Sequence, residues 1–131
     1  MITSAHLDEI VDRIVRHFDP EKIILFGSYA RGEARDDSDL DLLVVAQTDL
    51  RPRQRFHAVR ELLADYPVAF DLFLKTPEEY RRWRSVVNHI VYFADKYGKV
   101  VHERSDAGGG GTMAGAGRGG SPDGGDPFRA P

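Results

Sequence analysis

Two aspartates stand two residues apart at the start of a short apolar run, Leu40–Val45, that has the composition of a β-strand. Alternate residues of a strand share a face, so the carboxylates of Asp39 and Asp41 are expected to project in the same direction. Carboxylates this close repel one another and raise each other's pKa, a cost that a divalent cation removes. Mg²⁺ prefers oxygen ligands of this kind, and the pair therefore predicts a magnesium site.

A third acid, Asp71, interrupts another apolar run, Val68–Leu74. Placing a carboxylate in an otherwise apolar strand costs free energy unless the group finds a partner. A metal ion shared with Asp39 and Asp41 would supply that partner. The three acids are therefore candidate metal ligands.

The dipeptide Gly27-Ser28 follows directly after a third apolar run, Lys22–Phe26, where a strand is expected to give way to a helical turn. Glycine lets a phosphate approach the backbone closely. The following N–H groups and the Ser28 hydroxyl can bind phosphate oxygens, and Arg31 can add a bidentate grip. A triphosphate cradle beside an acidic metal site suits phosphoryl or nucleotidyl transfer, which depends on positioning and charge neutralisation.

Each of these features has a simpler explanation when it is taken alone. Acids before a strand often cap turns, which is the interpretation that we give to the loop residues Asp36, Asp37 and Ser38. Gly-Ser is a common turn, and Asp71 could be an edge residue that points to water. The combination of the three features favours a functional site over three unrelated turns.

Helices and strands that alternate along the chain are expected to position these residues. The predicted helices are 4–17, with Ser4 or Thr3 as its cap, then Arg53–Tyr66, and then a helical segment from Thr76 to Tyr97 that is either one helix or two with a break near Arg84–Asn88. Besides the three apolar runs, Lys99–His102 is expected to add a short edge strand. This order predicts an α+β or α/β domain whose sheet is covered by helices.

Composition places one domain in the first part of the chain. Ten of the 13 glycines lie in 108–125, so residues 105–131 are expected to form a disordered Gly/Pro-rich tail, and residues 1–104 the folded domain. A tail that docks on a partner is the alternative. The net charge of −3 argues against a strongly basic nucleic-acid binder. The lack of cysteines, of a signal peptide and of a membrane-length apolar run suits a cytoplasmic protein.

The motif order, Gly27-Ser28 followed after ten residues by Asp39-Leu40-Asp41, resembles the nucleotidyltransferase superfamily related to DNA polymerase β. The strand with Asp71, followed by Thr76–Tyr80 (TPEEY), is similar more specifically to the minimal nucleotidyltransferases. These are the prokaryotic antitoxin partners of HEPN-domain toxins. The resemblance covers about residues 5–103, and it implies the polymerase β-like fold with a short mixed sheet flanked by helices.

What this resemblance implies about function can be stated residue by residue. Gly27 and Ser28 would hold the triphosphate of ATP, while Asp39 and Asp41 would bind Mg²⁺, with two ions expected. Asp71 would be the third carboxylate and would help to deprotonate an acceptor hydroxyl. Family members add AMP from ATP to a tyrosine of the HEPN toxin and so silence its RNase activity. A hetero-oligomer with such a toxin is therefore expected.

The opposite assignment, to the toxins themselves, is not supported. HEPN toxins carry arginine, four residues, histidine, one residue and tyrosine. Arg84 and His89 have the first spacing, but Val91 stands where the tyrosine should be. We therefore interpret His89 as a structural or surface histidine.

Two other functions remain open at this point: an antitoxin that acts by binding alone, and a small-molecule nucleotidyltransferase of the antibiotic-modifying type. The three acids favour an enzyme over a pure binding module. Small-molecule enzymes usually need an added domain, for which about 104 folded residues leave no room. The large aromatic residues are expected to lie in the core or under a partner interface, which the arginines could line; these are Phe56, Tyr80 and Trp83, and Arg51, Arg53, Arg55, Arg60, Arg81, Arg82 and Arg84.

Overall fold

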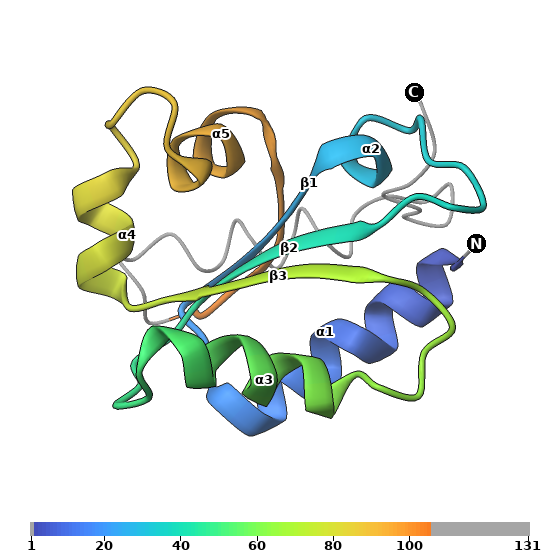
Figure 1. Cartoon of the computed structure of the whole chain (residues 1–131), viewed down its shortest axis with the longest axis horizontal. Helices are drawn as coiled ribbons and strands as arrows, with labels where there is room; N and C mark the ends of the chain where they lie inside the picture. Colours follow the sequence, from blue (N-terminus) through green and yellow to red (C-terminus); the bar gives the residue numbers. More distant parts are fainter. Residues whose placement is uncertain (1, 106–131) are drawn as a thin grey trace.

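The computed structural model describes residues 2–105 (Figure 1). The elements are α1 (Ser4–Phe18), β1 (Lys22–Phe26), α2 (Gly27–Ala30), β2 (Leu40–Val45), α3 (Pro52–Leu62), β3 (Phe70–Lys75), α4 (Pro77–Trp83), α5 (Ile90–Tyr97) and β4 (Lys99–Glu103). The disordered tail that the sequence predicts lies outside the described residues, apart from Ser105. No helix within this part of the chain is long and apolar enough to cross a membrane.

The four strands form one mixed sheet in the order β3-β2-β1-β4. β1 pairs antiparallel with both β2 and β4, whereas β2 and β3 run parallel to one another. The C-terminal end of β1 therefore lies at the same end of the sheet as the N-terminal ends of the other three strands. This topology brings Gly27, Asp39 and Asp71 to one end of the sheet, although they are far apart in the sequence.

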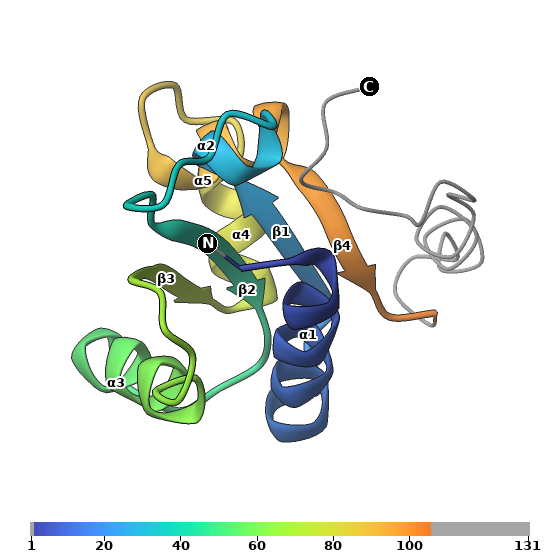
Figure 2. The ribbon, with the colours of Figure 1, turned by 90° about the vertical axis from the view of Figure 1, so that its right-hand side faces the viewer.

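The sheet has helices on both faces, and alternate strand residues supply two separate cores (Figure 2). One face packs against α1 and α3, with strand residues Ile23, Leu25, Leu40, Leu42, Val44, Leu72 and Leu74. The other face packs against α4 and α5, with strand residues Ile24, Phe26, Leu43 and Val45. The α+β fold with a helix-covered sheet is confirmed.

The first helix begins and ends as the sequence predicts, with Thr3 as its cap. The Thr3 hydroxyl accepts from the backbone N–H of His6 at 3.2 Å, and the His6 ring accepts from the N–H of Thr3 at 3.1 Å. Asp19, with φ of 47°, ends the helix in the left-handed conformation before Pro20. These caps satisfy end groups that would otherwise lack intrahelical partners.

The third helix is shorter than predicted, because it ends at Leu62 instead of Tyr66. Arg13 of α1 donates to the carbonyl of Leu62 at 3.3 Å and binds both carboxylate oxygens of Asp65. The Arg13 guanidinium also lies over the Tyr66 ring, 4.7 Å from its centroid. These contacts with α1 hold the segment after Leu62 in turns. The helical periodicity of the sequence does not reveal them, because they join residues far apart in the chain.

Two further boundaries can be compared with the sequence predictions. β3 begins at Phe70 instead of Val68, because its partner β2 begins at the paired residue Leu40. The helical segment after Thr76 is two helices, separated by a loop in which Asn88 has φ of 73°. His89 caps α5 by accepting from the N–H of Val91 and stacks on the Trp83 ring with centroids 4.6 Å apart. Its predicted structural role is confirmed.

Candidate active site

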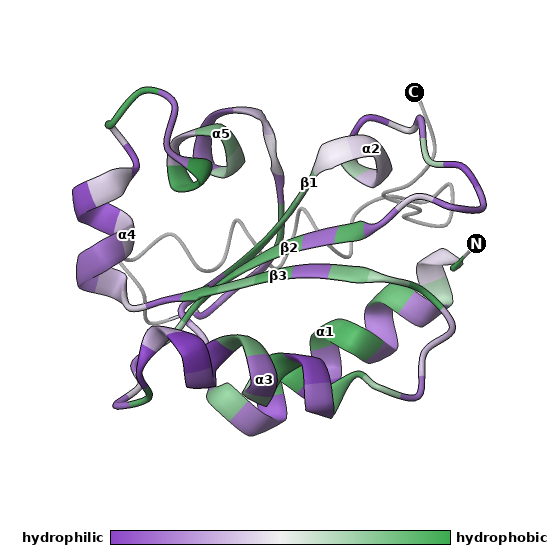
Figure 3. Ribbon diagram, in the orientation of Figure 1, coloured by the Kyte–Doolittle hydropathy of each residue, from purple (hydrophilic) through white to green (hydrophobic). Residues whose placement is uncertain are grey.

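The pairing of β2 with β3 places Asp41 directly beside Asp71. Neighbouring strands lie about 4.8 Å apart, so the two carboxylates start from adjacent backbone positions on one face of the sheet. Asp39 precedes β2 by one residue and has the same parity as Asp41. Asp39 and Asp71 are exposed and Asp41 is half-buried. Figure 3 shows the hydrophilic segments of β2 and β3 side by side on otherwise apolar strands.

Gly27 lies against this row of acids because β1 pairs Phe26 with Asp41. Its φ is +74°, a conformation that residues with a Cβ rarely adopt. A Cβ built on Gly27 would also overlap the Oδ2 atom of Asp41. Glycine is therefore required here both by the backbone and by the close carboxylate. Sequence reasoning assigned Gly27 to phosphate binding alone, because the antiparallel register that brings it to Asp41 has no sequence signature.

The environment of Asp41 raises its proton affinity. The pKa of Asp41 is raised from 3.8 to about 6 by burial first and then by the negative charges of Asp71 and Asp39, while the Arg31 guanidinium opposes the rise. Asp41 therefore carries a proton for part of the time near neutral pH when no cation is bound. A divalent cation would remove this repulsion, so the electrostatics and the all-oxygen donor set fit such an ion.

The short helix α2 presents Ser28 next to Gly27, both half-buried. The carbonyl of Ser28 accepts from the N–H of Glu33 at 2.9 Å, which closes the turn after α2. Tyr29 is buried at 1% exposure and its hydroxyl accepts from the N–H of Ile2 at 3.4 Å. This buried side chain fixes α2 to the start of the chain and so fixes the position of Ser28.

Arg31 reaches the site electrostatically, but its side chain has a partner. Its Nε donates to Oε1 of Glu33 at 2.9 Å, and both side chains are more than half exposed. Such an exposed pair is weak, so Arg31 can leave Glu33 for a stronger anion. Sequence reasoning did not identify Glu33 as the residue that competes with a phosphate for Arg31.

Within residues 2–105, no three His, Cys, Asp or Glu side chains are arranged closely enough to enclose a metal ion. Mg²⁺ usually takes only one or two carboxylates and completes its shell with water and phosphate oxygens. The row of Asp39, Asp41 and Asp71 has that character, because its carboxylates lie along one face and do not close into a cage. Binding there would accordingly depend on the phosphates of a nucleotide.

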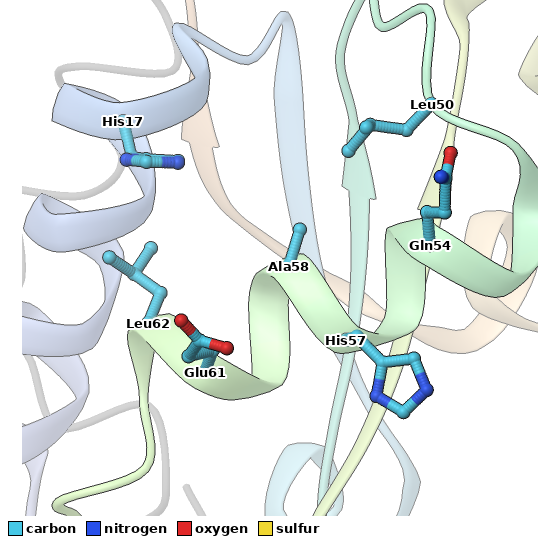
Figure 4. A pocket seen from close by; sticks show the side chains of 7 residues that line it. All are labelled: His17, Leu50, Gln54, His57, Ala58, Glu61 and Leu62. Carbon is cyan, nitrogen blue, oxygen red and sulfur yellow. The ribbon is translucent and has the colours of Figure 1, made fainter.

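A separate groove lies on the opposite face of the sheet, between the end of α1 and α3 (Figure 4). His17 and His57 line it together with Leu50, Gln54, Ala58, Glu61 and Leu62. His57 points away from His17 in this view, so the two rings do not converge. The groove therefore has neither a cluster of ligands nor a contact with the aspartates.

Comparison with known proteins agrees with this geometry. The sequence profile described as "Polymerase beta, Nucleotidyltransferase" matches residues 8–107. The chain belongs to this nucleotidyltransferase family. The solved structure of a candidate nucleotidyltransferase from Sulfolobus solfataricus superposes with a TM-score of 0.55 over 79% of this chain and 82% of that one, at 23% identity. That likeness supports the polymerase β-like nucleotidyltransferase fold.

Curated relatives narrow the family to the minimal nucleotidyltransferases. The protein adenylyltransferase MntA of Thermococcus cleftensis is 34% identical over 92 residues, which span 70% of this chain and 88% of the relative. A candidate protein adenylyltransferase of Methanocaldococcus jannaschii is 36% identical over 62 residues, which span 47% of this chain and 60% of that protein. The predicted family is thereby confirmed.

Proposed function

We propose that this nucleotidyltransferase moves AMP from ATP to a tyrosine hydroxyl of a HEPN-domain toxin and thereby neutralises the toxin. The observation that carries the proposal is the register that sets Asp41 beside Asp71 and against Gly27. That arrangement unites an acidic row with a glycine turn, the two halves of a nucleotidyl-transfer site. The names of the relatives, which are protein adenylyltransferases, support a protein acceptor.

Each site residue has a role in this proposal. Gly27 and Ser28 bind the triphosphate through backbone and hydroxyl groups, and Arg31 exchanges Glu33 for a phosphate oxygen. Asp39 and Asp41, with Asp71, hold Mg²⁺, which when bound neutralises phosphate charge and polarises the reacting phosphorus.

The transfer itself forms one bond and breaks one. The acceptor oxygen bonds to the α-phosphorus of ATP while the bond to the β-phosphate oxygen breaks, so pyrophosphate leaves. Asp71 is exposed, whereas Asp41 beside it is half-buried, and Asp71 lies on the edge strand, where an acceptor can approach. It accepts the hydroxyl proton as the new bond forms.

The direct test measures the mass of a HEPN-domain partner encoded beside this chain after co-expression and after incubation with ATP and Mg²⁺. We expect a gain of one or more AMP units on a tyrosine with the wild-type chain and none with Asp39→Ala. Asp37→Ala is the matched control, because it removes an equal charge from the exposed turn just before the site. Full transfer by Asp39→Ala would overturn the catalytic assignment.

The same co-expression separates the enzyme from an antitoxin that acts by binding. Growth of cells that carry the toxin with the Asp39→Ala chain reports neutralisation without transfer. We expect these cells to stop growing while Asp37→Ala cells survive. Survival of both would show that covering the toxin is sufficient and that transfer is secondary.

A further inference from the structure

The edge strand β3 has hydrogen-bonding groups that no other residue of the described chain uses. The carbonyls of Ala69 and Lys75 accept from β2 and the residue that follows it, at 2.8 and 2.9 Å. Backbone groups alternate in direction along a parallel strand, so residues 69, 71, 73 and 75 face β2. Phe70, Leu72 and Leu74 therefore direct their N–H and C=O groups away from the sheet. Within residues 2–105 only the Leu74 carbonyl has a partner, Arg55 Nη1 at a distant 3.4 Å.

The two edges of the sheet differ in how well they are protected from pairing. β4 has a shift of register opposite Ile23 and Ile24, and it carries charged residues at both ends. β3 pairs with β2 without interruption over six residues, Phe70–Lys75, and contains no proline. Natural proteins usually block free edges with bulges, prolines or charges. β3 has neither a bulge nor a proline, and its two charged residues are Asp71 of the acidic row and Lys75 at its end.

A groove runs along this edge, with α3 as its other wall. It is lined by Pro52, Arg55 and Phe56 from α3 and by Leu72, Phe73, Leu74 and Lys75 from β3. Phe56 is 37% exposed, so it does not pack in the core, and its other predicted place, under a partner interface, stays a prediction. The exposed Phe56 ring gives the groove an apolar surface beside the free backbone groups of β3. An added strand would use both, the backbone groups for hydrogen bonds and the ring for side-chain contact.

We propose that the acceptor protein presents its modified tyrosine on an extended segment that pairs with the free edge of β3. This inference rests on the proposed transfer to a protein tyrosine and names the way in which that protein is held. A residue directly opposite Asp71 in such a ladder has its Cβ about 5 Å from that of Asp71, on the same face. The sheet edge therefore delivers a hydroxyl to the row of carboxylates.

The same register assigns the neighbouring positions of the bound segment. Residues opposite Asp71, Phe73 and Lys75 lie on the carboxylate face, whereas a residue opposite Leu72 faces Phe56. The favoured segment therefore carries a tyrosine, then apolar residues at the next two positions, then an acidic residue two positions further. The segment has this order from its N-terminus if it runs parallel to β3. It has the reverse order if it runs antiparallel to β3.

Charge at the groove supports an acidic segment. Lys75 and Arg60 form no ion pair with any carboxylate of residues 2–105, and Arg60 lies over the Phe56 ring, 5.9 Å from its centroid. Arg55 is already neutralised by Glu79, with Nη1 and Oε1 2.6 Å apart. Lys75 lines the groove, so a carboxylate of the segment can meet an unpaired cation there, whereas Arg60 lies further along α3, outside the lining of the groove.

The probes are synthetic peptides with acetylated and amidated ends. The matched peptide is Tyr-Val-Val-Gln-Glu, tested also in reverse order, and the control is Val-Tyr-Val-Gln-Glu. A shift of one residue moves the tyrosine to the opposite face of the added strand. With ATP and Mg²⁺, we expect the matched peptide to gain AMP at least about tenfold faster than the control, since the control must forfeit backbone or side-chain contacts to react.

Amide hydrogen exchange on the same mixtures locates the peptide. The N–H groups of Phe70, Leu72 and Leu74 should exchange quickly in the free chain and slow about tenfold or more when the matched peptide is bound. Those of Asp71 and Phe73 already bond to β2 and should change little. A charge exchange adds a second readout: Lys75→Glu should slow transfer to the matched peptide, and a peptide with lysine in place of glutamate should restore it.

Several outcomes would overturn the inference. Equal modification of matched and control peptides, or no modification of either in both orders, would show that the edge does not select the acceptor. Protection of the N–H groups of Phe70, Leu72 and Leu74 already in the free chain would mean that the edge is covered. Loss of that protection when residues 106–131 are deleted would identify those residues as the cover. Dependence of the protection on protein concentration would identify a second copy of the chain. If the edge tests fail while a HEPN partner still gains AMP, only this inference falls. Loss of all protein transfer by the wild-type chain would instead remove the proposed function.

Discussion

The two faces of the sheet are built from the same strands, yet only one is closed. On the α1–α3 face, Leu40, Leu42 and Val44 are fully buried. On the α4–α5 face, Leu43 is equally buried, but the row continues into acids toward the start of β2. The exposed carboxylates show that α4 and α5 leave this end of their face open. A core and a polar site can thus alternate residue by residue along one strand.

The largest contrast is expected between the neighbours Asp41 and Leu42. Asp41→Ala should reduce transfer by about a hundredfold to a thousandfold, because a bound cation stabilises transition-state charge by several kcal/mol. Its melting temperature should be unchanged or higher, since a repelled carboxylate is removed. Leu42→Ala should lose about 2–5 kcal/mol of stability through the cavity that it leaves.

Transfer per folded molecule and denaturant unfolding distinguish the two effects. The Leu42→Ala chain that remains folded should retain most of its activity. Near-normal transfer by Asp41→Ala, or a large loss of its stability, would contradict the division of the strand into a core face and a site face.

The close approach of Gly27 to the open face gives the next largest effect. Gly27→Ala should strain a backbone with φ of +74° and push the Asp41 carboxylate aside. A displacement of about 1 Å at a reacting site can reduce the rate by about a hundredfold. Gly32→Ala is the control for backbone strain, because Gly32 has a φ of 72°. Equal losses of transfer by the two variants would show that strain, and not the contact with Asp41, is responsible.

The open face should also bind ATP only together with magnesium. Three carboxylates and a triphosphate repel one another, so titration calorimetry should show ATP affinity at least about tenfold weaker in EDTA than in Mg²⁺. Asp39→Asn/Asp41→Asn removes the repulsion and the ligands together. Its ATP affinity should be the same in both buffers and should exceed that of the wild type in EDTA. Equal wild-type affinity in both buffers would contradict the metal assignment.

The strands and the spacing of the acids were predictable from the sequence because both depend on short-range patterns. Leu40–Val45 and Lys22–Phe26 have the predicted bounds, and the parity of Asp39 and Asp41 follows from the strand alone. Contacts that depend on register were not predictable. The approach of Gly27 to Asp41 and the pairing of Asp41 with Asp71 are set by strand order, which a single sequence does not encode locally.

Tertiary contacts explain the remaining differences. Arg13 ends α3 early through a bond to the Leu62 carbonyl, a contact that joins residues 49 positions apart. Phe56 satisfies the helical periodicity of the core face and yet is exposed, because α3 runs along the edge of the sheet, where part of its surface overhangs the free strand β3. Periodicity identifies a face of a helix but not the width of the sheet beneath it.

The smallest predicted effect concerns the stability of the open face as a function of pH. Because the pKa of Asp41 is about 6 in the folded chain and near 3.8 when unfolded, the folded state holds a proton that the unfolded state releases. The stability that the protonated Asp41 contributes is therefore fully present below about pH 4 and is lost as the pH rises through 6. Asp41→Asn is neutral throughout, so it should exceed the wild type in stability at pH 8 by about 1 kcal/mol, after allowance for partial exposure.

Melting curves from pH 4 to pH 8 measure this difference, which should amount to a few degrees at pH 8 and vanish near pH 4. Asp37→Asn removes a charge from the exposed turn and controls for net charge. Mg²⁺ together with ATP at pH 8 should stabilise the wild type more than Asp41→Asn, and so narrow the gap, because the cation replaces the proton as the partner of the carboxylate. A gap that instead widened toward pH 4 would mean that the ionised Asp41 is stabilised in the folded chain. The acidic row would then be part of the packed structure, and the contrast between a closed and an open face would fail at its central residue.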